Sequence, residues 1–446
     1  MTTRREFIKT TALGTAGVTL VSGVGSSMIL PKTGATRVRV GIVGFSDRAR
    51  QSLIPSFLSQ NKELGFEIVA VSDIWSRRRE EAEKYFAKQG ISVKLYKNNE
   101  ELYASGDIDA VIISTADFQH AMHAIEAVRA GKDAYVEKPF AETMEDARLA
   151  KDVILKSGRI VQIGSQRRSA ANYIAANEYI KSGQFGPIVM VEMTWNVNQP
   201  DRWRRPDLVA QIKESDTDWK RFLLNRPIES WDPRKYLEYR LFWPYSSGIP
   251  GQWMSHQIDT VHWFSGYSHP RSVAANGGIY LWKDGRKNAD TMTAVFDYGP
   301  SDDLSTGFQV VYSSRFTNSF GGTKEFYFSN GGMLNLETNK ITPDGGLERS
   351  HAEPMGLKPN QLASFTLPST EINTSSNTGS DPMTTAHMRN WMECVINRKK
   401  PNADVTCGYN HAIANIMVTA ALHTGQKATF DESTQEVLAD GKVFKF

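Results

Sequence analysis

Lys138 stands where a lysine can meet a bound ligand. It follows the β-rich run 133–137 and precedes Pro139, so it lies at the carboxyl end of an expected strand. Ligands of open α/β sheets bind beyond this end of the strands. A lysine beside another positive charge has a lowered pKa and can then take a proton from an alcohol. Without such a context, a lysine in a loop before a proline is expected to be exposed to solvent.

His256 is a second candidate for proton transfer. Its neighbours on an expected helix are apolar, namely Met254, Ile258, Val261 and Phe264. A histidine in such surroundings is more often a hydrogen-bonded core residue than a catalytic one. Gln252 lies four residues earlier on the same helix face, so its amide is expected to orient the imidazole.

His256, Asp259 and His262 together suggest a metal site, but their spacing argues against one. Successive helical residues are rotated by about 100°, so His262 lies about 120° around the helix from His256. The three side chains cannot converge on one ion without distortion. We therefore predict no metal.

Strands and helices alternate along residues 35–165. The expected strands are 37–43, 67–72, 110–115, 133–137 and 160–163, and the expected helices are 49–58, 76–89, 120–130 and 144–157. Strands that alternate with helices of this length indicate βαβ units and a parallel, doubly wound sheet. We expect a Rossmann domain over residues 35–165.

The turn after the first expected strand carries only part of the glycine pattern that binds a dinucleotide. Gly44 is in place, but Ser46 and Ala49 stand where further glycines are usual. Alanine is accepted at the last of these positions. Asp73 ends the next strand, where a carboxylate can hydrogen-bond a ribose 2′-hydroxyl. A carboxylate there also repels the 2′-phosphate of NADP, so NAD is the expected cofactor.

Residues 166–446 are expected to form the substrate domain. The segments 195–205 and 232–245 are rich in aromatic, arginine and aspartate side chains. Such side chains suit sugars, whose rings offer apolar C–H faces and hydroxyl rims, but aromatic residues also dominate ordinary protein cores. Among them, we favour a ligand role for Arg202 and Tyr245.

Four segments make the chain resemble the Gfo/Idh/MocA oxidoreductases. They are VIISTADFQH at 111–120, YVEKPF at 135–140, GIPGQWMSHQIDTVHWFSG at 248–266 and the closing helices at 387–425. Glu-Lys-Pro and His-x-x-Asp are the specific elements, although Ala116 replaces the family's usual proline. The resemblance implies an N-terminal Rossmann domain and a C-terminal α+β domain with a large, mostly antiparallel open sheet.

The resemblance also implies roles for individual residues. Lys138 and His256 become the residues that handle the hydroxyl proton. Gln252 replaces the usual aspartate and cannot stabilise a charged imidazole, so we expect a weakened or altered base. The residues expected to hold the cofactor are Gly44, Phe45, Ser46, Asp73, Thr115, His120, Glu137 and Lys138. Those expected to face the substrate are Gln166, Arg202, Tyr245 and Asp259.

Residues 1–34 are interpreted as an export signal rather than as part of the fold. Arg4 and Arg5 precede a short run of apolar and small residues. The run is too short for a stable membrane span, and paired arginines before such a run are typical of a twin-arginine signal. We expect a periplasmic or otherwise exported protein.

The composition is that of an ordinary globular protein. Its 52 basic and 49 acidic side chains give a formal net charge of +3. A nearly neutral chain offers no electrostatic reason to bind nucleic acid. Cys394 and Cys407 fit no metal or redox motif, and we favour unpaired thiols over a disulfide. The family resemblance implies a homo-oligomer formed through the C-terminal sheet.

The expected function is NAD-dependent oxidation of a secondary alcohol in a small carbohydrate or polyol, with a tightly held cofactor. An exported enzyme has to regenerate its NAD in place. It can couple oxidation of one sugar to reduction of another, or it can hydrolyse a glycoside without net redox change through transient oxidation and elimination. A non-catalytic sugar-binding protein is the alternative from another class, which Ser46 and Gln252 favour.

Overall fold

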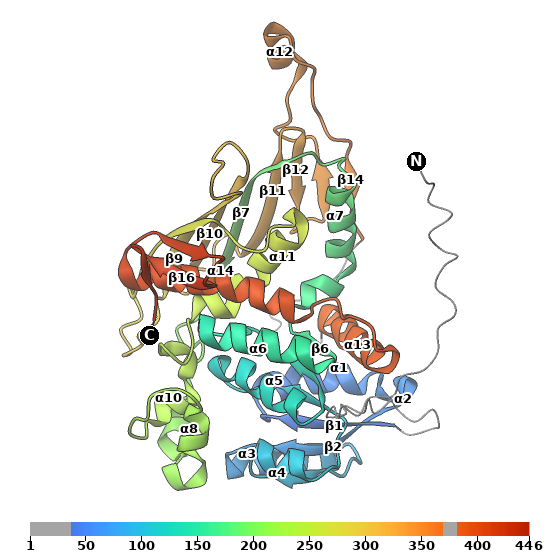
Figure 1. Cartoon of the computed structure of the whole chain (residues 1–446), viewed down its shortest axis with the longest axis vertical. Helices are drawn as coiled ribbons and strands as arrows, with labels where there is room; N and C mark the ends of the chain where they lie inside the picture. Colours follow the sequence, from blue (N-terminus) through green and yellow to red (C-terminus); the bar gives the residue numbers. More distant parts are fainter. Residues whose placement is uncertain (1–36, 369–380, 446) are drawn as a thin grey trace, which may run out of the picture. The chain divides into compact units, whose positions relative to one another are not determined.

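The computed structural model of the protein describes residues 37–368 and 381–445, which contain two β-sheets (Figure 1). The segment predicted to be an export signal, residues 1–34, lies outside the described residues. Among the residues that the structure describes, no helix is long and apolar enough to cross a membrane.

The first sheet has six parallel strands in the order β3-β2-β1-β4-β5-β6. They are β1 (Val38–Val43), β2 (Phe66–Ser72), β3 (Lys94–Tyr96), β4 (Ala110–Ile113), β5 (Asp133–Val136) and β6 (Val161–Ile163). The helices between them include α3 (Ser76–Ala87), α4 (Asn99–Ala104), α5 (His120–Arg129) and α6 (Met144–Ser157). β4 and β5 are buried throughout, as strands covered on both faces should be. The predicted parallel, doubly wound sheet is confirmed, whereas the short β3 and α4 were not predicted.

The helix expected at 49–58 consists of two different turns. A π-helical turn, η1 (Ala49–Leu53), leads into α1 (Ile54–Leu58), and α2 (Asn61–Leu64) follows. Pro55 lies in the first turn of α1, where its missing N–H costs little. The same missing N–H interrupts the hydrogen-bond pattern of one continuous helix, which accounts for the change of helix type.

The second sheet has eleven strands in the order β14-β13-β12-β11-β7-β10-β9-β8-β15-β16-β17. They are β7 (Ile188–Asn196), β8 (Ser272–Gly278), β9 (Thr291–Tyr298), β10 (Phe308–Arg315), β11 (Thr323–Ser329), β12 (Gly332–Asn335), β13 (Lys340–Thr342), β14 (Phe365–Thr366), β15 (Ala428–Asp431), β16 (Glu436–Ala439) and β17 (Lys442–Val443). All neighbours are antiparallel except the pair β7 and β10. The predicted large, mostly antiparallel sheet is therefore confirmed.

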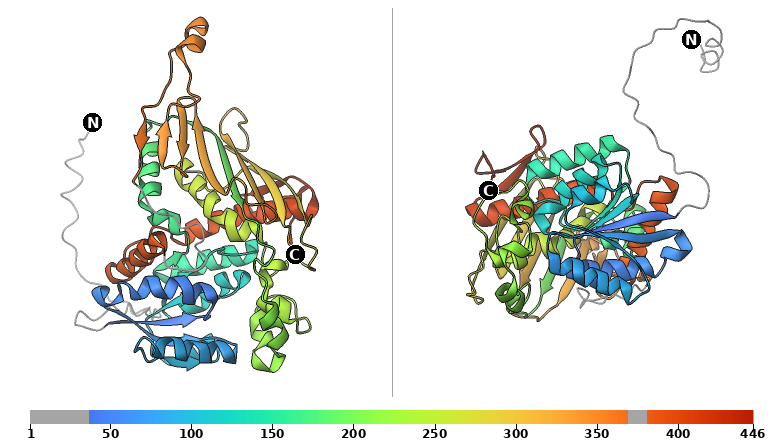
Figure 2. Two further views of the ribbon diagram at one scale, coloured as in Figure 1. Left: turned by 180° about the vertical axis from the view of Figure 1, so that it is seen from behind. Right: turned by 90° about the horizontal axis from the view of Figure 1, so that it is seen from below.

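Helices cover one face of the second sheet. They are α7 (Ala171–Lys181), α11 (Ser255–Ser265) and α14 (Val405–Thr424) (Figure 1). Buried and more exposed residues alternate along β9, as a sheet with one covered face requires. From behind, the other face carries no helix of the described chain (Figure 2). The homo-oligomer implied by the family resemblance would form through this sheet.

The C-terminal part of the chain returns to the first sheet. α13 (Pro382–Asn397) packs Trp391 against Tyr135 and Phe66, with ring centroids 6.1 and 6.2 Å apart. Gln162 on β6 donates to the carbonyl of His387 at 2.6 Å. A division at residue 165 thus separates the two sheets, while the packing of the first sheet also uses residues of α13.

The excursion at 197–245, between β7 and α11, contains three short helices. They are α8 (Pro206–Gln211), α9 (Trp219–Leu223) and α10 (Pro233–Leu237). α8 and α10 begin at a proline, and the Asp232 side chain caps α10 by accepting the amide of Arg234 at 2.8 Å. The excursion brings side chains from beyond residue 165 to the first sheet.

Candidate active site

Two adjoining cavities lie at the carboxyl end of the parallel strands. The glycine-turn cavity, of about 180 Å³, is lined by Gly44, Phe45, Ser46 and Asp73 among others. The lysine cavity, of about 470 Å³, is lined by residues that include Lys138, Gln166, Arg202, Gln252 and His256. Thr115, Arg205 and Arg240 line both cavities. A long ligand can therefore extend from one cavity into the other.

The glycine turn brings the backbone of β1 close to the end of β4. Gly44 has φ +84°, and a Cβ there would lie 2.9 Å from the Thr115 side chain and 3.0 Å from the Ser114 carbonyl. Glycine is thus required. Ser46, which stands in place of a second glycine, shares a 2.7 Å hydrogen bond with the Ser114 hydroxyl and accepts the amide of Ala49 at 3.2 Å. Its side chain ties the turn to the neighbouring strand.

Asp73 closes the glycine-turn cavity on the side of β2. Its carboxylate accepts the backbone amides of Phe45 at 2.8 Å and of Trp75 at 2.9 Å. Burial raises the pKa of Asp73, although these two amides oppose the shift. The amides hold the carboxylate at the turn, and each oxygen keeps a second lone pair that can accept a ribose hydroxyl. This arrangement suits a dinucleotide with an unsubstituted ribose.

Lys138 points its ammonium group at the helix that carries His256. Its Nζ donates to the Gln252 carbonyl at 2.7 Å. The pKa of Lys138 is lowered to about 8, mainly by burial; Glu137 and Asp117 oppose this shift, and Arg240 and Arg48 add to it. A lysine with this pKa exchanges a proton near neutral pH, as a general base must.

His256 faces the lysine cavity from α11. Its ring stacks on Trp195 with centroids 5.9 Å apart and planes 27° apart. Burial moves the pKa of His256 well below its usual value, and Lys138 and Arg167 add to the shift. No described residue hydrogen-bonds the ring. A neutral imidazole with both nitrogens available can therefore meet a ligand oxygen.

Gln252 does not orient His256, contrary to the expectation from a regular helix. Its Oε1 accepts Arg240 Nε at 2.9 Å, and its Nε2 donates to Asp117 at 2.5 Å. Gln252 lies in a π-helical turn, η6 (Pro250–Met254), which precedes α11. Its amide is held by these two partners outside the helix, so it is not available to the imidazole. Gln252 supports Lys138 through its carbonyl and Arg240 through its side chain.

Thr115, His120 and Glu137 line the lysine cavity as well. Glu137 accepts Arg48 Nε at 3.1 Å and Gln166 Nε2 at 3.2 Å. Burial opposes ionisation of Glu137, but Arg48 and Lys138 outweigh it and lower its pKa. His120 shares a 2.8 Å hydrogen bond with the Pro139 carbonyl. Glu137 therefore anchors two cavity side chains, Arg48 and Gln166, as a charged carboxylate.

Two residues expected to face the substrate do not line either cavity. Tyr245 is 3% exposed and packs edge-on against Phe118, with ring centroids 5.3 Å apart. Asp259, on α11, is fully buried and forms an ion pair with Arg168 at 2.8 Å. Contacts with distant parts of the chain turn both side chains into the core. We therefore assign them structural roles.

Asp259 belongs to a buried group with Cys407 and His411, whose potential ligand atoms all lie within 4.8 Å of one another. His262 lies elsewhere and shares a 2.9 Å hydrogen bond with Tyr298. The Asp259 carboxylate is already neutralised by Arg168, and burial raises the pKa of the Cys407 thiol, which stays protonated. The thiol donates a hydrogen bond to Asp259 at 2.9 Å. This group is explained without an ion.

Residues that were missed from the sequence lie in and beside the cavities. Arg48 and Arg240 line both cavities, and the fully buried Asp117 accepts Ser246 at 2.6 Å beside Gln252. Asp117 lies inside the segment 111–120 that carries the family resemblance, so the motif offered a signal for it. Nothing local distinguishes Arg240 from the other arginines of the excursion.

Comparison with known proteins agrees with this geometry. Residues 38–165 match the Gfo/Idh/MocA family model, described as "Oxidoreductase family, NAD-binding Rossmann fold". An inositol 2-dehydrogenase from Agrobacterium fabrum is 31% identical over 194 residues, or 42% of this chain and 54% of that protein. A 1,5-anhydro-D-fructose reductase from Ensifer adhaerens is 31% identical over 196 residues, or 42% and 56%. The chain spans about half the length of these curated relatives.

Solved structures extend the likeness to most of the fold. The WlbA dehydrogenase from Bordetella pertussis, crystallised with NADH and UDP-GlcNAcA, has a TM-score of 0.63 at 16% identity, over 89% of this chain and 98% of that one. The aldose-aldose oxidoreductase from Caulobacter crescentus has a TM-score of 0.58 at 18% identity, over 88% and 100%. Residues 38–165 therefore form an NAD-binding Rossmann domain of the Gfo/Idh/MocA oxidoreductase family, and the chain as a whole shares the two-sheet fold of these solved structures.

Proposed function

We propose that the protein is an NAD-dependent oxidoreductase that acts on a secondary alcohol of a sugar or polyol. The observation that carries the proposal is the presence of Lys138 and His256 in one cavity, both with lowered pKa values, next to a turn that fits a dinucleotide. The names of the curated relatives, an inositol 2-dehydrogenase and an anhydrofructose reductase, support the substrate class.

The residues at the glycine turn fit the cofactor. Gly44 leaves room for close approach of a pyrophosphate, Asp73 can bind the ribose, and the buried Thr115 hydroxyl lacks a partner within the described chain. NAD, when bound, supplies the hydride acceptor. The fit rests on the chain's own geometry rather than on the incomplete glycine pattern.

Lys138 and His256 have different roles at the alcohol. The neutral amine of Lys138 accepts the hydroxyl proton as the carbon gives up its hydride, and the alcohol becomes a carbonyl. His256, neutral at physiological pH, donates a hydrogen bond to the same oxygen and holds it. The Gln252 carbonyl keeps Lys138 Nζ in place between turnovers.

The wall of the lysine cavity supports a carbohydrate. Trp195 and Trp253 stack with ring centroids 5.7 Å apart and planes 7° apart, and Arg202 lies over Trp253 at 5.5 Å. Gln166 adds an amide at the same cavity. Apolar ring faces beside polar groups match the C–H faces and hydroxyls of a sugar or cyclic polyol.

Export remains part of the proposal, because the N-terminal sequence is of the twin-arginine type. An exported oxidoreductase regenerates NAD in place, either with a second sugar or by redox-neutral glycoside hydrolysis. Product analysis without an added acceptor separates these mechanisms, because only the redox-neutral enzyme turns over repeatedly.

The deciding experiment is a screen in which sugars, glycosides and polyols are each added to the purified protein. The measurement is the nicotinamide absorbance. Reduction of NAD by a polyol or sugar, absent in Lys138→Met, is the expected result. A protein that neither holds nor takes up NAD, yet binds sugars, would contradict the proposal and identify a binding protein.

A further inference from the structure

Part of the second domain covers the glycine-turn cavity. The cover, residues 203–240, comprises most of the excursion and includes α8, α9 and α10. It contributes Leu208, Arg221, Phe222, Tyr236 and Leu237 to the lining of the cavity. A dinucleotide-binding turn in an open α/β fold would need no such cover for binding alone.

The lining identifies the end of the dinucleotide that lies under the cover. Asp73 is the residue placed for the ribose of the adenosine half. Trp75, two residues further on, packs edge-on against Tyr236 of the cover, with ring centroids 6.2 Å apart. The adenosine end would therefore lie between the end of β2 and α10.

The cover is tied to the first domain on one side of the cavity near its mouth. Arg205 of the cover pairs with Asp47 of the glycine turn at 3.2 Å. Arg77, at the start of α3, donates to the side chain of Gln211 at 2.8 Å. These two ties connect the cover to both segments that flank the ribose position.

The cover is tied on the opposite side as well. Arg221 pairs with Glu126 of α5 at 2.8 Å. Gln119 donates to the Phe222 carbonyl at 2.7 Å. Arg226, only 1% exposed at its side chain, pairs with Asp146 of α6 at 3.1 Å. Because the cover is held on both sides of the cavity, the loss of one contact would loosen it without freeing it.

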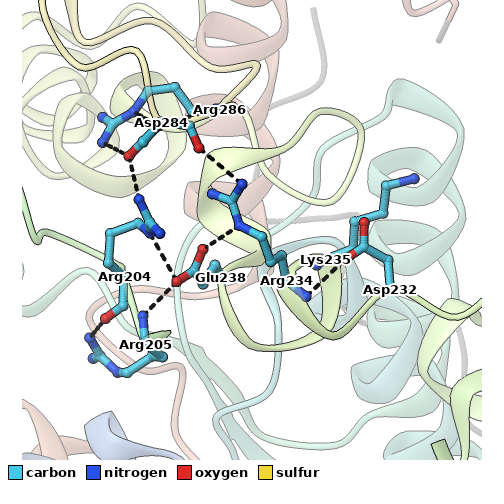
Figure 3. Close-up of polar contacts among 8 residues, drawn as sticks. All are labelled: Arg204, Arg205, Asp232, Arg234, Lys235, Glu238, Asp284 and Arg286. Carbon is cyan, nitrogen blue, oxygen red and sulfur yellow. Dashed lines mark hydrogen bonds and ion pairs between the residues drawn. The ribbon is translucent and has the colours of Figure 1, made fainter. Parts of the chain in front are cut away.

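A charged network inside the second domain holds the cover in its own shape (Figure 3). Glu238 is at its centre, with a side chain that is 0% exposed. Its carboxylate accepts Arg204 Nε at 3.0 Å, the Arg205 amide at 2.7 Å and Arg234 Nε at 2.8 Å. The network fixes the residue that pairs with Asp47.

The network also extends to the loop between β8 and β9. Arg204 pairs with Asp284 at 3.0 Å, and Asp284 pairs with Arg286 at 2.8 Å. Arg234 donates to the Asp284 carbonyl at 2.9 Å. Charge-assisted hydrogen bonds of this kind are the strong ones, and opening the cover would break several together.

We propose that the cover encloses the adenosine end of NAD and makes the cofactor a resident group that is reduced and reoxidised without leaving. The inference rests on the proposed function. A resident cofactor adds a requirement to the proposed function. After one alcohol has given up a hydride and a proton, a carbonyl compound must take both back in the same site. That acceptor is a sugar aldehyde or ketone, or the oxidised substrate itself.

The test measures cofactor exchange rather than activity. Holoprotein is incubated with an excess of isotopically labelled NAD, separated from free nucleotide, denatured, and the bound label is quantified by mass spectrometry over time. Glu238→Gln keeps the shape of the side chain but removes the charge that three donors share. We expect exchange at least about tenfold faster in this variant, because buried cations lose their partner.

Two further variants keep the test decisive. Gln211→Ala removes the tie to Arg77 without disturbing the buried network. We expect it to speed exchange by a smaller factor than Glu238→Gln, and it serves as the test if Glu238→Gln does not fold. Glu353→Gln removes an exposed pair with Arg349, outside the cover, and serves as the matched control with unchanged exchange.

The outcomes separate this inference from the proposed function. Slow exchange in the native protein and fast exchange in Glu238→Gln support the cover. Fast exchange in the native protein, or equal rates in all variants, overturns the cover while leaving an NAD enzyme. Failure of the native protein to bind labelled NAD at all overturns both.

Discussion

The two cavities differ in how their charges are balanced. At the glycine turn, Asp47 pairs with Arg78 and Arg205, and these cations outweigh the effect of burial and lower its pKa. In the lysine cavity, burial lowers the pKa values of Lys138 and His256, so that Lys138, with a pKa of about 8, can release its proton near neutral pH and His256 stays neutral. Matched charges hold parts of the chain together, whereas destabilised charged forms provide proton acceptors near neutral pH.

The comparison assigns different consequences to substitutions in the two regions. Changes at matched charges should alter cofactor exchange and leave the chemistry intact. Changes at Lys138 or His256 should alter the chemistry and leave cofactor binding intact. The following expectations run from the largest effect to the smallest.

Replacement of Lys138 should have the largest effect. Lys138→Met keeps an apolar stem of similar length but removes the proton acceptor, and we expect kcat to fall about 10³-fold. Bound NAD, measured on the denatured protein, should be unchanged. Lys62→Met at an exposed position is the control. A variant that keeps more than a tenth of the native rate would rule out Lys138 as the base.

His256→Asn should lower kcat by about 10². Asparagine can still donate a hydrogen bond, but it cannot place it where the imidazole does. The rate of hydride transfer in a single turnover is the measurement, with His351→Asn at an exposed position as the control. If only KM rises, His256 binds the substrate and does not assist the chemistry.

Gln252→Glu tests the charge near Lys138. The oxidation rate of the native enzyme should rise with pH and level off above about 8, because Lys138 acts when deprotonated. A glutamate beside Asp117 adds negative charge and raises the pKa of Lys138. We expect this limb of the pH–rate profile to move up by about one unit, which lowers the rate about tenfold at neutral pH.

The control for this shift is Gln252→Leu, which adds no charge, and Gln361→Glu at an exposed position adds charge far from the cavity. Neither should raise the limb. An unmoved limb in Gln252→Glu would show that another group, not Lys138, titrates in the profile.

The same contrast explains which features could be predicted from the sequence. Lys138 and Asp73 end buried parallel strands, and the sheet topology alone brings such positions to one edge. Local sequence patterns were sufficient there. The parallel sheet follows from the same kind of pattern, whereas the large second sheet was predicted from the family resemblance.

Other features depend on contacts that no local pattern contains. Gln252 was expected to orient His256, but Arg240 and Asp117 hold its amide instead. Tyr245 was placed at the substrate, but it packs on Phe118, more than a hundred residues away in the sequence. The cover closes over the first domain through separate polar ties such as Arg221 to Glu126. Each of these features depends on long-range geometry, which a single sequence does not specify.

The smallest expected effect is a change in the free energy of unfolding that is caused by the buried carboxyl group of Glu142. Glu142 is 2% exposed, and its Oε1 has no hydrogen-bond partner among the described residues. Burial raises the pKa of Glu142, and the neighbouring Asp117 raises it further. The folded protein therefore keeps this proton at pH values where the unfolded chain has released it. Stability is lost as the pH rises from the unfolded pKa towards the folded one.

Glu142→Gln removes this dependence because glutamine cannot ionise. We expect the variant to gain about 1 kcal/mol in the free energy of unfolding at pH 7.5 relative to pH 5, compared with the native protein. Urea unfolding at the two pH values measures the difference, and Glu337→Gln at an exposed position should show none. A gain that is equal at both pH values would mean that Glu142 is already ionised in the folded protein. Glu142 would then carry an uncompensated negative charge. The destabilisation of charged forms that is found in the lysine cavity would not extend to this residue.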